Sequence, residues 1–180
     1  SAYVCYENQK LGIIREMFAE PTDSKTIIFS SSKLKVKELA HTLKRMKLNV
    51  AAMHSDLEQA QREEVMLDFK NNKVSILVAT DIVARGIDIE DIGLVINYDV
   101  PHDPEDYIHR IGRTARAAAT GSAVTFVSEE EQGKFHQIEK FIERDIRKAE
   151  LPESVGEGPK YAPDENRGRF GRGGRSGGRS

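Results

Sequence analysis

The sequence is poor in the residues that build covalently linked or metal-held frameworks. It has a single cysteine, Cys5, and no tryptophan among its 180 residues. One cysteine excludes a disulfide framework and a cysteine-based metal site, and it favours a reducing compartment. The five histidines show no ligand spacing, so no metal site is expected. No apolar run approaches the ~20 residues that cross a bilayer and no signal peptide is recognised, so we expect a cytoplasmic protein without membrane contact.

Charge is divided unevenly along the chain. The whole chain has a formal net charge of −2, but residues 167–180 contain five arginines and no acidic residue. The residues before them therefore carry a net charge of −7. An acidic body with a basic tail confines any contact with a polyanion to a local patch and to the tail.

Short apolar runs rich in β-branched residues alternate with segments of helical periodicity. The expected strands are Tyr3 to Tyr6, Thr26 to Phe29, Leu48 to Met53, Ser75 to Ala79, Leu94 to Tyr98 and Ser122 to Val127. The expected helices are Asn8 to Phe18, Leu34 to Met46, Gln59 to Phe69 with Asp56 as a cap, one led by Pro104, and Glu129 to about Lys148. This alternation predicts an α/β fold with a mostly parallel sheet and helices on both faces.

Three of the predicted strands are followed by small polar residues. These segments are Ser30–Lys33, His54–Asp56 and Thr80–Asp81. Ligands of parallel sheets bind at the loops beyond the carboxyl ends of the strands, and hydroxyl groups and a lysine suit phosphate oxygens. Ordinary helix caps and turns explain any one of these segments, but they explain three in succession less well.

The composition changes after about Ala149. Residues 149–166 are rich in Pro, Gly and Glu and are expected to form a linker. Residues 167–180 alternate arginine with glycine and cannot bury a core, which predicts a disordered tail. With Phe170 interleaved, the tail can contact phosphates and stack on bases, so we favour RNA contact over a purely solubilising role.

A dense arginine cluster occupies His109–Arg116, which reads His-Arg-Ile-Gly-Arg-Thr-Ala-Arg. Arginine is always charged, and its planar guanidinium binds phosphate through two hydrogen bonds. Such a cluster is costly unless an anion or a set of carboxylates faces it. A solvated basic turn is the alternative, because charge runs usually lie at the surface.

Five motifs stand in order along the part of the chain that is expected to fold. They are Ile27 to Lys33, Asp56 through Gln59 with Arg62, Thr80 through Asp88, Asp99-Val100-Pro101, and His109 to Arg116. In this order and spacing the chain resembles the second, C-terminal RecA-like domain of the DEAD-box ATP-dependent RNA helicases, over roughly residues 1–148. The resemblance implies a three-layer α/β sandwich, and the arginine-glycine tail resembles that of bacterial RhlE-like members.

The resemblance implies that several residues contact ATP. Arg113 and Arg116 match the arginine fingers that reach the γ-phosphate, where a guanidinium stabilises the charge of the transition state. Asp88 matches the carboxylate that contacts the ribose, and Gly86 permits the tight turn before it. The alternatives are that Asp88 is a turn residue and that the two arginines form structural salt bridges when no nucleotide is present.

The resemblance also implies RNA contacts at three further residues. Ser32, Arg62 and Thr80 match residues that bind the phosphate backbone of RNA. Thr80 could instead cap a helix, and Arg62 could pair with Glu58 or Glu63 on its own helix.

Two residues are expected to connect the ATP contacts with the RNA contacts. His109 matches a residue that links the two sites. Asp81 is acidic, which argues against phosphate contact, and it is expected to orient the arginine cluster. The chain departs from the family pattern at Ser55 and Ala115, where glycine is usual. The serine removes the usual reason to expect a backbone contact with RNA at that point, whereas alanine is tolerated wherever φ is negative.

The chain lacks the two motifs that hold ATP in such enzymes. It contains neither a Gly-Lys-Ser/Thr phosphate cradle nor an Asp-Glu-Ala-Asp motif for magnesium. We therefore expect half of an active site, in a monomer that is inactive alone. ATP and Mg²⁺ would be bound mainly by an N-terminal RecA-like lobe of the same protein, and that lobe and RNA are the expected partners.

Two other interpretations stay open at this point. The chain could be a stand-alone RNA-binding or adaptor module without ATPase activity, or part of a helicase that acts on DNA. The residues encoded before Ser1 would decide the first. ATPase stimulation by RNA and by DNA would decide the second, because the ribose 2′-hydroxyl distinguishes the two polymers.

Overall fold

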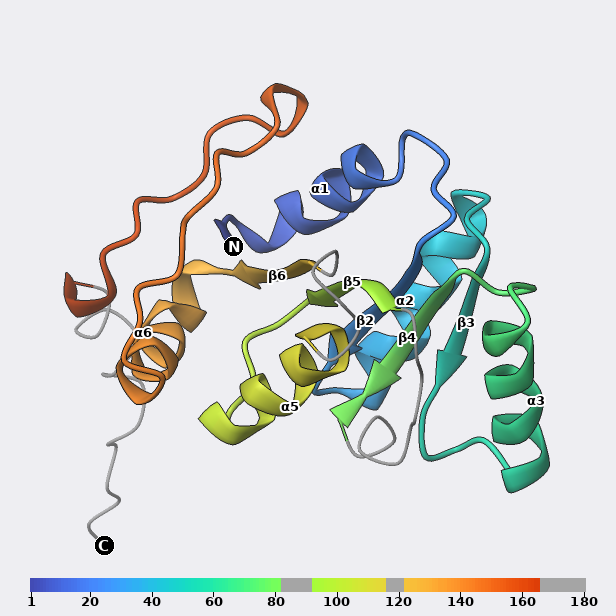
Figure 1. The fold of residues 1–180 in the computed structure, drawn as a ribbon. Coiled ribbons are helices and arrows are strands. Elements are labelled where there is room, and N and C mark those ends of the chain that lie inside the picture. Colours follow the sequence, from blue (N-terminus) through green and yellow to red (C-terminus); the bar gives the residue numbers. More distant parts are fainter. Residues whose placement is uncertain (82–91, 116–121, 166–180) are drawn as a thin grey trace, which may run out of the picture.

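Six strands form one parallel sheet in the part of the chain that the structure describes (Figure 1). This computed structural model describes residues 1–81, 92–115 and 122–165, except for the side chains of residues 112–115. The strands are β1 (Ala2–Val4), β2 (Lys25–Ser30), β3 (Val50–Met53), β4 (Ile76–Thr80), β5 (Ile92–Asn97) and β6 (Ser122–Val127). Their order in the sheet is β1-β6-β5-β2-β4-β3, and each described pairing is parallel.

Helices lie between the strands along the chain. Within the described ranges they are α1 (Lys10–Met17), α2 (Lys33–Arg45), α3 (Gln59–Lys70), α5 (Pro104–Ala115) and α6 (Gln132–Phe141). Short 3₁₀ helices cover Glu7–Gln9 (η1), Glu129–Glu131 (η3) and Glu153–Val155 (η4). Figure 1 shows α1 and α6 on opposite sides of β6.

Alternate side chains of the central strands enter different layers of the core. From β2, Ile28 packs in the cluster that contains α1 and α2, whereas Ile27 and Phe29 pack in the cluster that contains α3. A third cluster joins α5 and α6 to the end of the sheet formed by β1 and β6. Burial on both faces explains why the central strands read as continuous apolar runs. The predicted α/β fold with helices on both faces is confirmed.

Helices α2 and α3 each begin beside one of the polar segments that follow the strands. The observed N-cap of α3 differs from the predicted one. Ser32 caps α2, and its Oγ accepts a hydrogen bond from the backbone N–H of Lys35 at 3.3 Å. Helix α3 is capped by Glu58, not by Asp56, so the predicted cap is wrong. The Asp56 carboxylate instead lies between two ammonium groups, those of Lys33 and Lys37.

The last helix is shorter than its apolar periodicity predicts. Helix α6 ends at Phe141, and Glu143 adopts a left-handed φ of 53°. The chain then turns so that the backbone of Ala2 bonds on both sides of Lys148, with Ala2 N donating to Arg147 O and Ala149 N donating to Ala2 O, each at 2.8 Å. Pairing with β1 covers a strand edge that would otherwise stay open, which explains why the helix stops early.

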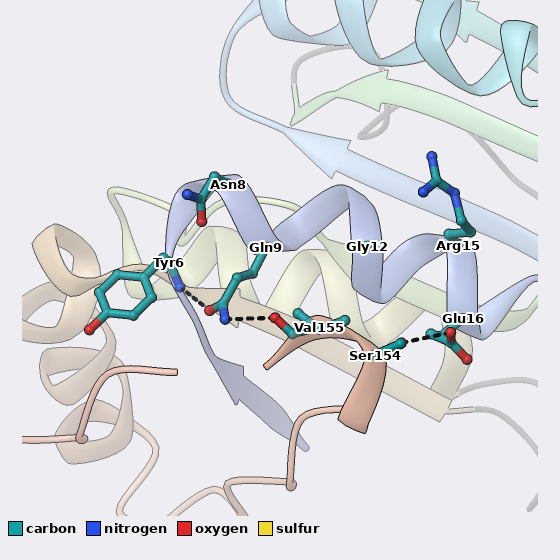
Figure 2. A pocket seen from close by; sticks show the side chains of 8 residues that line it. All are labelled: Tyr6, Asn8, Gln9, Gly12, Arg15, Glu16, Ser154 and Val155. Carbon is teal, nitrogen blue, oxygen red and sulfur yellow. Dashed lines mark hydrogen bonds between the residues drawn. The ribbon is translucent and has the colours of Figure 1, made fainter. Parts of the chain in front are cut away.

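Residues 151–162, expected to be part of a linker, are packed against the body and are called the C-terminal strap below. Figure 1 shows this segment, in orange to red, leaving α6, reaching α1 and returning toward α6. At the N-cap of α1, the side-chain amide of Gln9 donates to the carbonyl of Val155 at 3.2 Å (Figure 2). It also donates to the carbonyl of Glu157 at 2.9 Å. Ser154 Oγ donates to Glu16 at 2.7 Å.

The returning half of the strap is bound to α6. The side chain of Gln132 bonds the backbone of the strap twice, at Lys160 O and Ala162 N. Tyr161 donates its hydroxyl to Glu139, which also accepts from Lys148 at 2.5 Å. Burial raises the pKa of Glu139, but these two hydrogen bonds, a third from the backbone of Ile146 and the charge of Lys148 together hold the pKa below its usual range. Composition predicted a linker here because it does not reveal such individual contacts.

The packing of the strap predicts that a Gly→Ala substitution lowers stability inside the strap but not at an open position of α6. A Cβ at Gly158 would lie 2.6 Å from the Val4 carbonyl oxygen and 2.7 Å from Leu151 Cδ1. Gly158→Ala should therefore lower the free energy of unfolding by about 1–3 kcal/mol, measured by thermal or urea unfolding. Gly133→Ala in α6 meets nothing within 4 Å and should be neutral or gain up to about 1 kcal/mol. Equal stability of the two variants would show that the strap is not packed in solution.

Candidate functional site

The carboxyl ends of three neighbouring strands bring polar residues to one edge of the sheet. Ser30 ends β2 and is in register with Thr80, which ends β4, while Asn97 ends β5 on the other side of β2. Ser31, Asp81 and Asp99 follow these strands within two residues. Because parallel strands end at the same edge, the three loops converge, as the sequence predicted for two of them.

A buried arginine of α5 lies at the centre of these loops. The side chain of Arg110 is 2% exposed and forms a two-bond pair with Asp81, at 2.5 Å through Nε and 2.6 Å through Nη2. Its Nη1 donates to the carbonyl oxygen of Asp99 at 3.0 Å, and its Nη2 donates to Ser31 Oγ at 3.2 Å. The guanidinium also lies over the ring of Phe29, 5.6 Å from its centroid. One side chain therefore joins α5 to all three strand ends.

The carboxylate of Asp99 completes this arrangement. It accepts a hydrogen bond from Ser30 Oγ at 2.6 Å and from the backbone N–H and the hydroxyl of Ser31 at about 3 Å. It also lies 3.5 Å from Arg110 Nη2. We call Ser30, Ser31, Asp81, Asp99 and Arg110 the Arg110 cluster. Its two carboxylates balance the buried guanidinium, which would otherwise be costly to bury.

Local sequence explains why α5 presents Arg110 inward and His109 outward. The helix begins at Pro104, a favoured first-turn residue, and the Asp103 side chain accepts from the Glu105 N–H at 2.9 Å. Tyr107 lies one turn before Arg110 on the face that packs in the core. His109 is 57% exposed, with its Nδ1 4.0 Å from Asp106.

The predicted ATP contacts are described only in part. Arg113 lies in the last turn of α5, one turn after His109 and three residues after Arg110. Its side chain, together with Gly86, Asp88 and Arg116, lies outside the described residues. The helix that carries Arg113 is thus fixed by the Arg110 cluster. The sequence led us to expect that Asp81 orients the arginines, but it did not distinguish Arg110 from the other arginines.

The three predicted RNA contacts lie on different elements. Ser32 caps α2, so its Oγ accepts one helical N–H and keeps its own proton to donate. Thr80 is nearly buried at the end of β4. Arg62 on α3 donates from Nη2 to the carbonyl of Ser55 at 3.2 Å, and its buried Nε has no hydrogen-bond partner. The alternative pairing of Arg62 with acidic residues of α3 is not found in the described structure.

A second charged group lies beside these residues, in the loop before α3. Asp56 binds Lys33 at 2.9 Å and Lys37 at 2.5 Å, both from α2. Hydrogen bonds from Lys37 and Lys33 lower the pKa of Asp56 to about 2. The sequence indicated Lys33 as a phosphate ligand, but it gave no sign that Lys37, one turn further along α2, meets the same carboxylate.

A buried lysine and two carboxylates support the loop that contains Asp99. Lys10 of α1 is 1% exposed and lies between Glu7 at 2.8 Å and Glu131 at 3.2 Å. Burial lowers the pKa of Lys10, but the two carboxylates outweigh it and raise the pKa. Glu131 also accepts from the backbone N–H of Val100 at 2.6 Å, which anchors the chain directly after Asp99.

The described residues contain neither a cluster of metal ligands nor a membrane-spanning helix. No group of three or more His, Cys, Asp or Glu side chains is placed to hold a metal ion. No described helix is long and apolar enough to cross a membrane.

Comparison with known proteins assigns the family. Residues 9–118 match the family described as "Helicase conserved C-terminal domain". The solved structure of a DEAD box protein from the hyperthermophile Methanococcus jannaschii resembles this chain with a TM-score of 0.77 and 37% identity, over 83% of this chain and 41% of that one. The chain belongs to the DEAD-box helicases, as their C-terminal RecA-like domain. The resemblance seen in the ordered motifs is confirmed.

This DEAD-box domain is shorter than the full-length relatives that it resembles. It is 39% identical to the ATP-dependent RNA helicase eIF4A of Meyerozyma guilliermondii over 151 residues, which are 84% of this chain but 38% of that protein. It also resembles Dbp5 of S. cerevisiae bound to RNA and ADP BeF3, with a TM-score of 0.75 and 32% identity, over 84% of this chain and 40% of that one. The domain thus spans about two fifths of the length of these relatives.

The Arg110 cluster predicts strong energetic coupling within the DEAD-box domain. Asp81→Asn and Arg110→Met should each lower the free energy of unfolding by about 3–5 kcal/mol, because each leaves a buried charge without its partner. The double variant should cost about 1–3 kcal/mol less than the sum of the single variants, measured by urea unfolding.

Lys35→Gln is the matched control for these variants. Lys35 forms an exposed pair with Glu7 at 3.0 Å, so its loss should cost less than about 1 kcal/mol. Additive costs in the double-mutant cycle, or a cost for Asp81→Asn as small as that of the control, would contradict the cluster.

Proposed function

We propose that this domain is the C-terminal lobe of an ATP-dependent RNA helicase. It would couple ATP binding and hydrolysis to RNA binding and local unwinding of duplexes. The observation that carries the proposal is the buried Arg110, which fixes α5 with Arg113 to the strand ends that bear Ser32 and Thr80. The RNA and ADP BeF3 bound to the similar Dbp5 of S. cerevisiae support it.

Arg113 and Arg116 are the proposed catalytic residues. As arginine fingers they would donate hydrogen bonds to the γ-phosphate held by a second lobe and stabilise the charge that spreads over its oxygens. Gly86 and Asp88 would bind the nucleoside, with Asp88 on the ribose. The donor set fits a phosphate, because guanidinium groups grip phosphate oxygens in pairs. Mg²⁺, when bound, would neutralise phosphate charge, and we expect its ligands in the other lobe.

The proposed RNA contacts are Ser32, Arg62 and Thr80. Arg62 gives the most specific support, because its buried Nε lacks the hydrogen-bond partner that buried polar groups normally have. A phosphate oxygen at this position would supply that partner. Ser32 supports the same assignment, since its hydroxyl proton stays available after capping α2.

His109 and Asp81 are proposed to couple the two sites. Asp81 directly follows Thr80, and its carboxylate holds Arg110, which directly follows His109. A displacement of the β4 end by RNA would therefore be transmitted through the Asp81–Arg110 pair to α5. The pair thus offers a short physical route from an RNA contact to the helix that carries an arginine finger.

The proposed enzyme needs a second RecA-like lobe before Ser1. The Gly-Lys-Ser/Thr and Asp-Glu-Ala-Asp motifs that bind ATP and magnesium do not occur in this sequence. ATP and RNA would draw the two lobes together, and hydrolysis would release them. This domain alone is proposed to be an inactive monomer, with RNA and the N-terminal lobe as its partners in the cytoplasm.

The arginine-finger assignment is tested with the domain joined to its N-terminal lobe. Arg113→Ala should lower RNA-stimulated ATP hydrolysis by about 10³-fold or more, because a finger of this kind contributes about 10³–10⁵ to the rate. Arg113→Lys should not restore the rate, since an ammonium cannot form the paired contact. Lys140→Ala on α6 controls for loss of a surface charge.

Near-normal turnover of Arg113→Ala would contradict the assignment. A joined protein that binds RNA but hydrolyses no ATP even without substitutions would favour the alternative function, a stand-alone RNA-binding or adaptor module. Unfolding curves of each variant separate lost chemistry from lost structure.

The tail, residues 167–180, is proposed to bind RNA through phosphate contacts. It lies outside the described residues. Each phosphate contact with single-stranded RNA contributes about 0.7 to the slope of log K against log salt. Deleting the five arginines should therefore flatten the slope by up to about 3.5, measured by RNA titration between about 50 and 200 mM salt. An unchanged slope would make the tail a spacer.

A further inference from the structure

Two exposed lysines of α2 share one carboxylate at the rim of the strand-end site. Lys33 and Lys37, one helical turn apart, bind the two oxygens of Asp56 at 2.9 and 2.5 Å. All three side chains are about half exposed, at 47%, 44% and 44%. Ser32, the cap of α2, directly precedes Lys33. The group thus adjoins two proposed RNA contacts, Ser32 on α2 and Arg62 on α3.

The loop that carries Asp56 is held in place by its own hydrogen bonds. The backbone N–H of Leu57 donates to the His54 carbonyl at 3.2 Å, and the N–H of Asp56 donates to His54 Nδ1 at 3.3 Å. Arg62 donates to the carbonyl of Ser55 at 3.2 Å. The turn between His54 and Leu57 therefore fixes the carboxylate, while the lysines reach it on long flexible stems.

The surroundings of Asp56 are positively charged. Burial lowers the pKa of His54, and the nearby charges of Lys37, Lys33 and Arg62 lower it further, against the opposing effect of Asp56. The buried Nε of Arg62 faces no acceptor in the described structure. Two lysines thus bind one carboxylate here, and Arg62 acts on the neighbouring His54, so three cations lie in or beside this loop and can attract anions.

We propose that Asp56 is a built-in competitor of the RNA backbone. In the free domain it neutralises Lys33 and Lys37. When RNA binds Arg62 and Ser32, the two lysines leave Asp56 and contact phosphates of the same strand. This inference rests on the proposed function, because it extends the RNA-binding surface by two residues and adds a group that weakens binding.

Energetics favour an exchange of this kind. An exposed ion pair is worth only about 0–1 kcal/mol, so releasing the lysines from Asp56 costs little. A lysine that contacts a phosphate gains from the release of counterions into the solvent. The ammonium group is a point charge on a flexible stem, so it can move from one anion to another without a fixed geometry. Asp56 would therefore lower RNA affinity without blocking the site.

If Asp56 competes with RNA, removing its negative charge and removing the positive charges of the two lysines should have opposite effects on RNA binding. Asp56→Asn should tighten binding of a short single-stranded RNA by about 2–5-fold, because the lysines no longer have to leave a carboxylate. The double variant Lys33→Gln/Lys37→Gln should flatten the salt slope by about 1.4, since two phosphate contacts are lost. Both are measured by fluorescence anisotropy of a labelled RNA with the 180-residue chain.

Two further variants make the test specific. Lys35→Gln removes one positive charge from the same helix at the Lys35–Glu7 pair, away from Asp56, and should change the slope by less than half as much as Lys33→Gln or Lys37→Gln alone. Adding Asp56→Asn to the double lysine variant should give no gain in affinity. A gain there, or equal slope changes for Lys35→Gln and for either single lysine variant, would overturn the proposal in favour of general electrostatics.

Arg62→Gln separates failure of this inference from failure of the proposed function. If Arg62→Gln weakens RNA binding while Asp56→Asn and the lysine variants do not change it, the competitor role is overturned and the RNA-binding function stands. If none of these variants changes binding, both are overturned. Inorganic phosphate is the second probe, and a gain in its affinity equal to that for RNA in Asp56→Asn would assign the lysines to a free anion instead.

Discussion

The buried pair between Arg110 and Asp81 is the interaction on which the functional edge of this domain depends. The Arg110 guanidinium is almost fully excluded from water, so its N–H groups need acceptors within the protein. The chain directly after β2, β4 and β5 supplies these acceptors. Because each loop contributes an acceptor, none can move far without leaving a charge unpaired. The edge therefore behaves as one body, although its residues are up to 79 positions apart in the chain.

This constraint explains how an arginine cluster serves two purposes. Arg110 faces the sheet and holds the strand ends together, whereas His109 is exposed. Arg113 lies one turn after His109 on the same helix. The sequence predicted the α/β fold well, because buried strands such as β4 are apolar except for their last residue and alternate with amphipathic helices. It also indicated the strand-end loops and the arginine cluster.

What the sequence could not predict depends on contacts between distant residues. Arg110 looks like its neighbouring arginines until the fold places Asp81 and Asp99 around it. The early end of α6 and the packed strap have the same cause, since only the fold shows that Lys148 meets the edge of β1 and that Tyr161 meets Glu139. Asp56 was assigned to a helix cap by spacing alone, but in the fold it binds two lysines from another helix.

Hydrogen exchange tests the central claim most directly. If Arg110 unites the three loops with α5, Asp81→Asn should accelerate amide exchange in α5 and in the loops after β2 and β5 together, although the substitution lies after β4. Exchange in the C-terminal strap, which has its own contacts, should stay unchanged. Acceleration confined to the residues next to Asp81 would contradict the account, because the loops would then be held independently of one another.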